Sequence, residues 1–272
     1  MPSIRASGWN FLSSSDWDPV KGIFGSVPFV YGTIVSSLIA LLIATPFGLG
    51  ISLFLTELAP LKLRDPVAFI IEILAAIPSV VFGLWGIFLL APFMRVHVDP
   101  FLAKLGGLLG LPFFKEPSTG LSLFTAGVIL SIMILPTITA ISREVFESIP
   151  NSYRESAKAI GATNWETILL AVVQPSKVGV LGAIMLALGR ALGETMAVTM
   201  VIGNRPEISK SLFAPGYTMA SVIANEFTEA TGNLYLSALV EIALVLLLLT
   251  VIVNGLARLL IWSITRGTPS RV

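Results

Sequence analysis

The chain has 272 residues, of which 55% are hydrophobic and only 12% are charged, and its mean hydropathy is +0.89. An ordinary soluble domain carries roughly 25% charged residues, so about half the usual charge is available to cover a surface. Seventeen basic residues against sixteen acidic ones give a net charge of +1, which excludes a basic patch for nucleic acid. The absence of cysteine and the single histidine, His97, exclude a disulfide framework, thiolate catalysis and a metal centre built from these ligands. The composition therefore predicts an integral membrane protein without a cofactor.

Apolar runs long enough to cross a bilayer occur five times along the chain. A helix needs about 20 predominantly apolar residues to span the hydrocarbon core. The predicted spans are 27–56, 67–94, 121–142, 178–203 and 235–257. The first 20 residues are polar and aromatic, and they fit neither a signal peptide nor a span. The sequence therefore predicts an all-α integral membrane fold with five transmembrane helices, in a domain over residues 27–264.

The basic residues indicate an orientation. With the connection 143–177 in the cytoplasm, nine basic residues lie inside and seven outside, which is the direction of the positive-inside rule. We therefore expect an extracytoplasmic N-terminal segment over 1–26, extracytoplasmic connections over 95–120 and 204–234, a cytoplasmic loop over 143–177, and a cytoplasmic tail over 265–272.

The hydrophilic loop contains two short helical stretches separated by a glycine. Residues 155–160 favour a helix, Gly161 breaks it, and Asn164 can cap a second short helix that begins at Trp165. Such a loop would project from the membrane as a rigid, partly apolar knob. By shape alone, an ordinary helical hairpin remains an alternative.

The same loop resembles the E-A-A-x-x-x-G motif of ABC importer permeases. Glu155, Ala157 and Gly161 match the motif, with Ser156 where the first alanine usually stands. The resemblance implies that the loop docks on an ATP-binding subunit as a coupling helix; the alternative is a solvated loop without a partner. The chain contains no G-x-x-x-x-G-K-[ST] phosphate-binding sequence. We therefore expect a transport subunit that is not itself an enzyme and needs a separate ATPase chain.

The fourth predicted span carries two charges. Arg190 and Glu194 are four residues apart, which places them on one face of a continuous helix. Either charge at the centre of a bilayer costs about 2.5–3.5 kcal/mol, so each needs a partner or a hydrated path. Gly189 and Gly193 form a G-x-x-x-G pattern that predicts close approach of another helix.

Two interpretations of this charged span stay open. In the first, the guanidinium of Arg190 lines the path of an anionic substrate, and Glu194 holds Arg190 between transport events. In the second, the two residues form a purely structural ion pair.

The segment GRALGETMAVTMVIGN is similar to the phosphate-specific ABC importer permeases, in particular to their C-type subunit, and the resemblance runs over residues 17–266. It implies a type I ABC importer permease core in the bacterial cytoplasmic (inner) membrane, with inorganic phosphate as substrate. The implied partners are two copies of the ATP-binding subunit, a homologous A-type permease and an extracytoplasmic phosphate-binding protein. Members of this family have six spans, so we expect the usual first helix to be missing, either through a truncated start or in a five-span variant.

Other polar residues in the spans carry smaller expectations. Glu72 is expected near a cytoplasmic span end, and Glu241 is expected to reach the outer interface. Thr195, Thr199 and Asn204 extend the polar character of the fourth span; contact with substrate is open for each, although threonine in a membrane helix commonly bonds to its own backbone. The alternatives for function are a permease for another oxyanion and a self-sufficient secondary anion transporter. An intramembrane enzyme is disfavoured because no Ser/Lys pair or H-E-x-x-H sequence is present.

Overall fold

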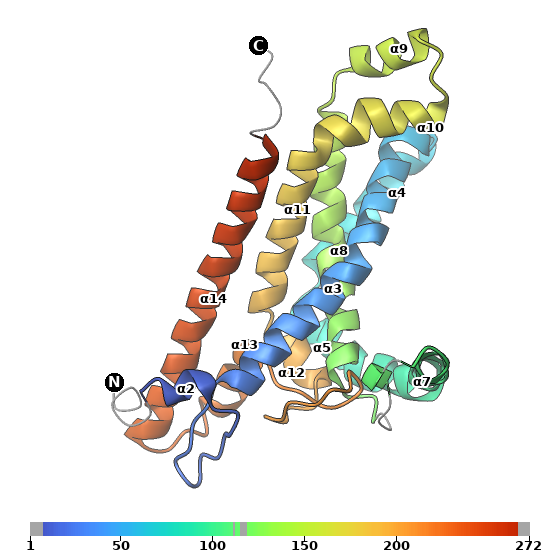
Figure 1. Cartoon of the computed structure of the whole chain (residues 1–272). Helices are drawn as coiled ribbons and strands as arrows, with labels where there is room; N and C mark the ends of the chain where they lie inside the picture. Colours follow the sequence, from blue (N-terminus) through green and yellow to red (C-terminus); the bar gives the residue numbers. More distant parts are fainter. Residues whose placement is uncertain (1–7, 111, 115–118, 266–272) are drawn as a thin grey trace. The chain divides into compact units, whose positions relative to one another are not determined.

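The computed structural model describes residues 8–110, 112–114 and 119–265, and helices dominate this part of the chain (Figure 1). Within the described residues no strand forms; one isolated bridge joins Asp18 and Ile23. The expected tail over 265–272 lies outside the described residues except for Thr265, as does the start of the 1–26 segment. The all-α expectation is confirmed.

Helical segments follow one another with few breaks, and several contain π-helical turns (η). In chain order they are α2 (Asn10–Ser13), α3 (Val27–Leu53), η1 (Phe54–Leu58), α4 (Leu61–Ala76), α5 (Ser79–Trp85), η2 (Gly86–Leu90), α6 (Ala91–Phe93), η3 (Met94–Val98), α7 (Asp99–Leu108), the 3₁₀ turn η4 (Pro112–Phe114), α8 (Leu123–Glu147), α9 (Asn151–Ala159), α10 (Asn164–Thr167), η5 (Ile168–Val173), α11 (Gln174–Gly193), α12 (Met196–Val201), α13 (Met219–Glu226) and α14 (Asn233–Thr265).

Five helices of the described chain are long and apolar enough to cross a membrane, as predicted. They cover Val27–Leu58, Ser79–Leu108, Leu123–Glu147, Asn164–Gly193 and Asn233–Ser263. In the third helix 61% of the most apolar window is buried inside the chain, against 28–33% in the other four. Most of the apolar surface of those four helices is therefore left for lipid or other subunits to cover.

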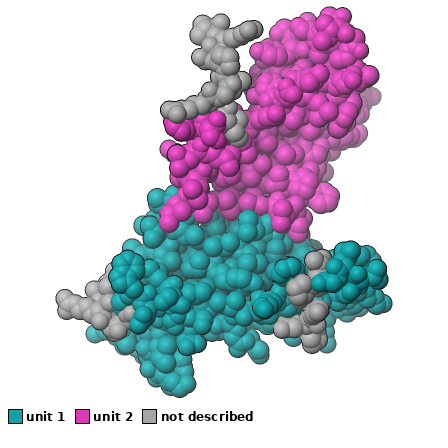
Figure 2. All heavy atoms as spheres, viewed as in Figure 1, with its two compact units in different colours: residues 1–40, 78–131, 191–251 teal, residues 41–77, 132–190, 252–272 magenta. Residues whose placement is uncertain are grey.

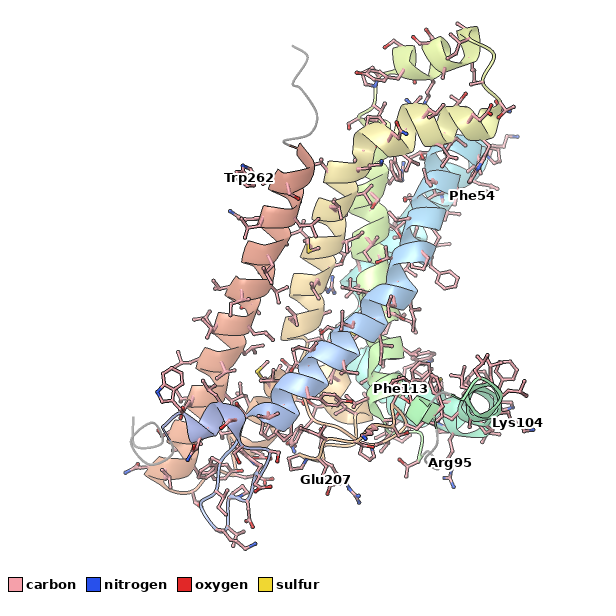
Figure 3. The ribbon with its side chains drawn as sticks, in the orientation of Figure 1. Phe54, Arg95, Lys104, Phe113, Glu207 and Trp262 are labelled. Carbon is pink, nitrogen blue, oxygen red and sulfur yellow. The ribbon has the colours of Figure 1, made fainter. Side chains whose placement is uncertain are left out.

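The second span differs from the prediction because the chain breaks at Pro78. Ile77 is extended, since the residue before a proline is disfavoured in the helical region, and Pro78 itself is extended with a ψ of 141°. The helix of the span therefore begins at Ser79 and continues to Leu108, through much of the connection expected over 95–120. Figure 3 shows Arg95 and Lys104 extending away from this segment.

The fourth span is also shifted relative to the prediction, from 178–203 to Asn164–Gly193. The helix ends at Gly193 because side chains just beyond it bond to the local backbone. The Thr195 hydroxyl donates to the Gly193 carbonyl at 3.1 Å, and the Glu194 carboxylate accepts from the Ala197 N–H at 3.4 Å. Such bonds compete with helix continuation. A separate short helix, α12, follows.

The chain forms two compact units, drawn in different colours in Figure 2. Unit 1 comprises residues 1–40, 78–131 and 191–251. It contains an aromatic and aliphatic cluster in which the ring of Trp17 packs edge-on against Phe24 and Phe29 at centroid distances of 5.0 and 4.8 Å. The buried members of the cluster are Phe11, Phe24, Phe29, Tyr217, Met219, Val222, Ala238, Leu239 and Ile242.

Unit 2 comprises residues 41–77, 132–190 and 252–272. Its helices approach one another closely at glycines. A Cβ added to Gly48 of α3 would lie 2.8 Å from the side chain of Ile138 on α8, and one added to Gly179 of α11 would lie 2.6 Å from Val145 on α8. Unit 2 also carries α9, which has no buried residue.

Candidate functional sites

The end of α9 shows why the motif residues of the loop stand at their spacing. Gly161 has a φ of +91°, a left-handed conformation that glycine adopts without steric cost. Its N–H donates to the Lys158 carbonyl at 3.0 Å, and the Ala162 N–H donates to the Ala157 carbonyl at 3.1 Å. This bond pair is a Schellman motif, which closes a helix end. The predicted break at Gly161 is confirmed, and the carbonyl of Ala157 accepts one of its closing bonds.

The following helix is capped by Thr163 and not by Asn164, which is the first residue of α10. The Glu166 N–H donates to the Thr163 hydroxyl at 3.3 Å, and the Thr163 N–H donates to the Glu166 carboxylate at 2.8 Å. This reciprocal arrangement is a capping box, and it selects threonine because a glutamate stands three residues later. From α10 the helix continues through η5 into α11, so the projecting element is α9 and its turn.

Large apolar side chains are exposed on this element and on α10, which follows its turn. Ile160 is 85% exposed, Trp165 61% and Tyr153 54%. Glu155 is also exposed, whereas Ala157 is half-buried. The partly apolar knob expected from the sequence is therefore present.

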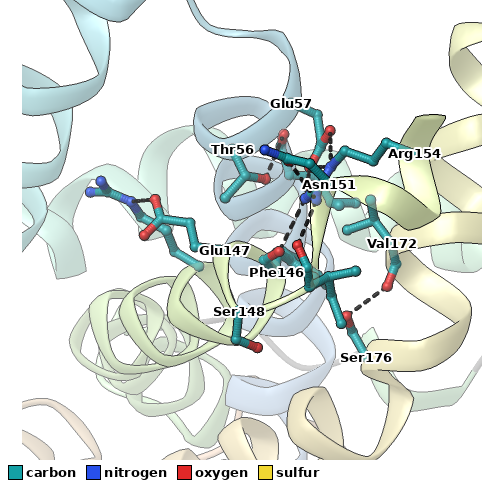
Figure 4. Close-up of polar contacts among 12 residues, drawn as sticks. Thr56, Glu57, Phe146, Glu147, Ser148, Asn151, Arg154, Val172 and Ser176 are labelled. Atoms are coloured by element: carbon teal, nitrogen blue, oxygen red, sulfur yellow. Dashed lines mark hydrogen bonds and ion pairs between the residues drawn. The ribbon is translucent and has the colours of Figure 1, made fainter.

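One polar contact attaches α9 to the ends of two membrane helices (Figure 4). The Arg154 guanidinium lies 2.7 Å from the Glu57 carboxylate through Nη2, and its Nε donates to both carboxylate oxygens at 3.2 and 3.3 Å. The same guanidinium donates to the Ile149 carbonyl at 2.7 Å and to the Phe146 carbonyl at 3.2 Å. Sequence reasoning missed this contact, because its two residues are 97 positions apart and no local pattern links them.

Arg190 and Glu194 do not share one helix face. Arg190 lies in unit 2 on α11, is exposed, and donates to the Thr137 hydroxyl at 3.3 Å. Glu194 lies in unit 1, beyond the last residue of α11, and its carboxylate caps the start of α12. The prediction of stacked charges on a continuous helix is therefore wrong, because that helix ends at Gly193.

The small-residue pattern of α11 is divided between a packed and an open side. Ala187 and Ala191 are buried, with exposures of 0% and 4%. A Cβ added to Gly189 or Gly193 would meet no described atom within 4 Å. In the described part of the chain, no helix packs on these two glycines.

Three other polar residues were expected within the predicted spans: Thr199, Glu241 and Glu72. The Thr199 hydroxyl donates to the Thr195 carbonyl at 2.7 Å, as expected. Glu241 is only 9% exposed and lines an apolar cavity with Trp9 and Leu244, and its place at the outer interface stays a prediction. Glu72 is exposed on α4 and lines a cavity of about 230 Å³ whose other members include Arg143, Glu144 and Glu147.

Comparison with known proteins identifies a family whose members are similar to this chain. The family described as binding-protein-dependent transport system inner membrane component matches residues 44–266. The phosphate transport system permease protein PstC of Mesorhizobium japonicum is 48% identical over 270 residues, 98% of this chain and 82% of that protein. The protein of the same name in Pasteurella multocida is 47% identical over 97% of this chain and 83% of that protein.

Solved structures agree at the level of the fold. A chain of the MetNI methionine ABC transporter in an inward-facing conformation superimposes with a TM-score of 0.67 at 17% identity, covering 91% of this chain and 99% of that one. A chain of a bacterial ABC transporter involved in the import of alginate gives a TM-score of 0.57 at 18% identity, covering 85% of this chain and 78% of that one.

Proposed function

The chain belongs to the family of binding-protein-dependent transport system inner membrane components, and from this membership we propose that it is the permease subunit through which an ATP-driven importer moves inorganic phosphate. It is a multi-pass membrane protein with the fold of ABC importer permeases. The observation that supports phosphate as the substrate is the 48% identity, over nearly the whole chain, to a phosphate transport permease. The proposed location is the bacterial cytoplasmic (inner) membrane.

We propose that α9 and its turn couple this subunit to ATP hydrolysis on a separate chain. Glu155, Ala157 and Gly161 mark the docking element, oriented toward the cytoplasm. Support comes from the exposed apolar side chains of Ile160 and Trp165, which offer a partner a hydrophobic contact. A type I importer would present one such element from each of two permeases to two copies of the ATP-binding subunit.

Arg190 is the residue proposed to meet the substrate in transit. Its guanidinium is exposed on a helix that is long and apolar enough to span the membrane. Contact with lipid would cost about 2.5–3.5 kcal/mol at the bilayer centre, which favours a hydrated or protein-covered position. A guanidinium presents paired N–H donors that fit the oxygens of phosphate, and it keeps its charge at every physiological pH. Glu194 is proposed to line the same path.

The open glycines of α11 support the proposal of a second permease. Gly189 and Gly193 offer a surface on which another helix can pack closely, and the described chain supplies none. We propose that the homologous A-type permease covers this surface. An extracytoplasmic phosphate-binding protein would deliver the substrate on the side of the 1–26 segment and the 204–234 connection.

Reconstituted transport tests this function. The permease is assembled in liposomes with its A-type partner, the ATP-binding subunit and the binding protein, and uptake of labelled phosphate is measured with and without ATP. We expect uptake only with ATP and with the ATP-binding subunit. Uptake by the permeases alone would favour a secondary transporter. ATP-dependent uptake of a different oxyanion, with phosphate unable to compete, would favour a permease for that oxyanion.

A further inference from the structure

The geometry points to Arg154 and Glu57 as positioning residues for ATP-driven transport, acting together as the connection that passes movement of α9 to two membrane helices. This inference rests on the proposed function of the chain. Neither residue belongs to the docking motif or to the proposed substrate path. Both lie within unit 2.

The first argument is the number of elements that one side chain joins. Arg154 is in the middle of α9, and Glu57 is in η1 at the end of the first membrane helix. The carbonyl of Phe146, in the last turn of α8, the third membrane helix, also accepts from Arg154, as does the carbonyl of Ile149 in the linker between α8 and α9. A cation is favourable there because the last carbonyls of a helix lack partners within the helix and carry partial negative charge.

The second argument is that α9 buries no side chain in its contacts with η5 and α10. None of its nine residues is buried, and only Arg154 and Ala157 are even half-buried. Helices in proteins usually gain most of their stability from packing of an apolar face. α9 lies against η5 and α10 without burying an apolar side chain, so the contacts of Arg154 help to fix its position.

The third argument is the quality of the contact. The side chains of Arg154 and Glu57 are only 18% and 12% exposed, so solvent screens their attraction less than in a surface pair. The guanidinium meets both oxygens of the carboxylate, which fixes direction as well as distance. A second ion pair of unit 2, Arg143 with Glu147, is a four-residue pair within α8 whose glutamate is 47% exposed. It joins no separate elements and serves as the matched control.

The test compares the double neutral variant Glu57→Gln/Arg154→Gln with the control Arg143→Gln/Glu147→Gln in the reconstituted importer. The double variant leaves no unpaired charge behind, which removes the main reason for misfolding. The measured quantity is the number of phosphate ions imported per ATP hydrolysed. Loss of assembled complex alone lowers both rates together and leaves this ratio unchanged.

We expect the ratio of phosphate imported to ATP hydrolysed to fall by about fivefold or more in the Glu57/Arg154 variant. About fivefold is the lower end of the typical energetic coupling between two separate sites in a protein. In the control variant the ratio should stay at the wild-type value. An unchanged ratio in the Glu57/Arg154 variant would overturn the inference. Absence of ATP-dependent phosphate uptake by the wild-type complex would instead contradict the proposed function.

A second measurement tests the position of α9 without transport. A spin label on a cysteine at Ser152, an exposed residue of α9, reports the mobility of that helix in the purified permease. The Glu57/Arg154 variant is expected to make the label more mobile, and the control variant is not. Equal mobility in the two variants would also overturn the inference, whatever the substrate proves to be.

Discussion

Replacement of Gly161 should weaken the turn after α9 through backbone strain alone. The φ of +91° is unfavourable for any residue with a Cβ, and no described atom lies within 4 Å of the place where a Cβ would go. Steric contact with neighbours therefore adds nothing. A left-handed backbone costs roughly 1–2 kcal/mol for an ordinary residue, and asparagine tolerates it better. Gly161→Ala should cost about that amount, Gly161→Val more because of its branched Cβ, and Gly161→Asn less.

Hydrogen exchange of the amides at the turn measures this cost directly. The N–H groups of Gly161 and Ala162 are protected by the two bonds that close α9. A loss of about 1–2 kcal/mol corresponds to roughly 5- to 30-fold faster exchange when opening is local. The control is Gly107→Ala, since Gly107 has equally open surroundings but lies inside α7 without a positive φ. Exchange at the wild-type rate in Gly161→Ala, or equal rates in the valine and asparagine variants, would refute the reasoning.

Three further predictions follow from other parts of the chain. Arg190→Gln should abolish phosphate uptake in a complex that still assembles, and the variant that also neutralises Glu194 should stay inactive; recovered uptake in the double variant would make Arg190 a structural residue. Gly32→Ala should lower the melting temperature of the purified subunit, because the added Cβ would overlap the carbonyl oxygen of Tyr217, and overpacking typically costs about 1–3 kcal/mol; an unchanged melting temperature would show that the backbone yields easily there. A cysteine at Ser156 should react with a membrane-impermeant reagent in inverted vesicles only, and labelling in intact cells would show that the orientation is the opposite of the predicted one.

Much of the architecture could be predicted because it depends on properties that are local in the sequence. The five membrane helices follow from the length of apolar runs, and the end of α9 follows from one glycine at a fixed distance from Ala157. The span boundaries were less accurate. Hydropathy averages over a window and does not register the break at Pro78 or the local bonds of Glu194 and Thr195 that end α11.

The contacts between distant segments could not be predicted from one sequence. In the sequence, Glu57 is an ordinary charged residue at the end of a span, and Arg154 is one of several basic residues in a hydrophilic loop. Only folding brings them together across 97 positions. The cavity that Glu241 lines could not be predicted for the same reason, since Trp9 and Leu12 of the N-terminal segment also line it.

The exposed side chains of Ile160 and Trp165 have a consequence for the life of the subunit before assembly. A copy without its partners presents these large apolar groups to water at the end of α9 and in α10, which is the kind of surface that chaperones and proteases recognise. We therefore expect unassembled copies to be short-lived, so that the cell matches the amount of permease to the amount of its partners by degradation of the surplus.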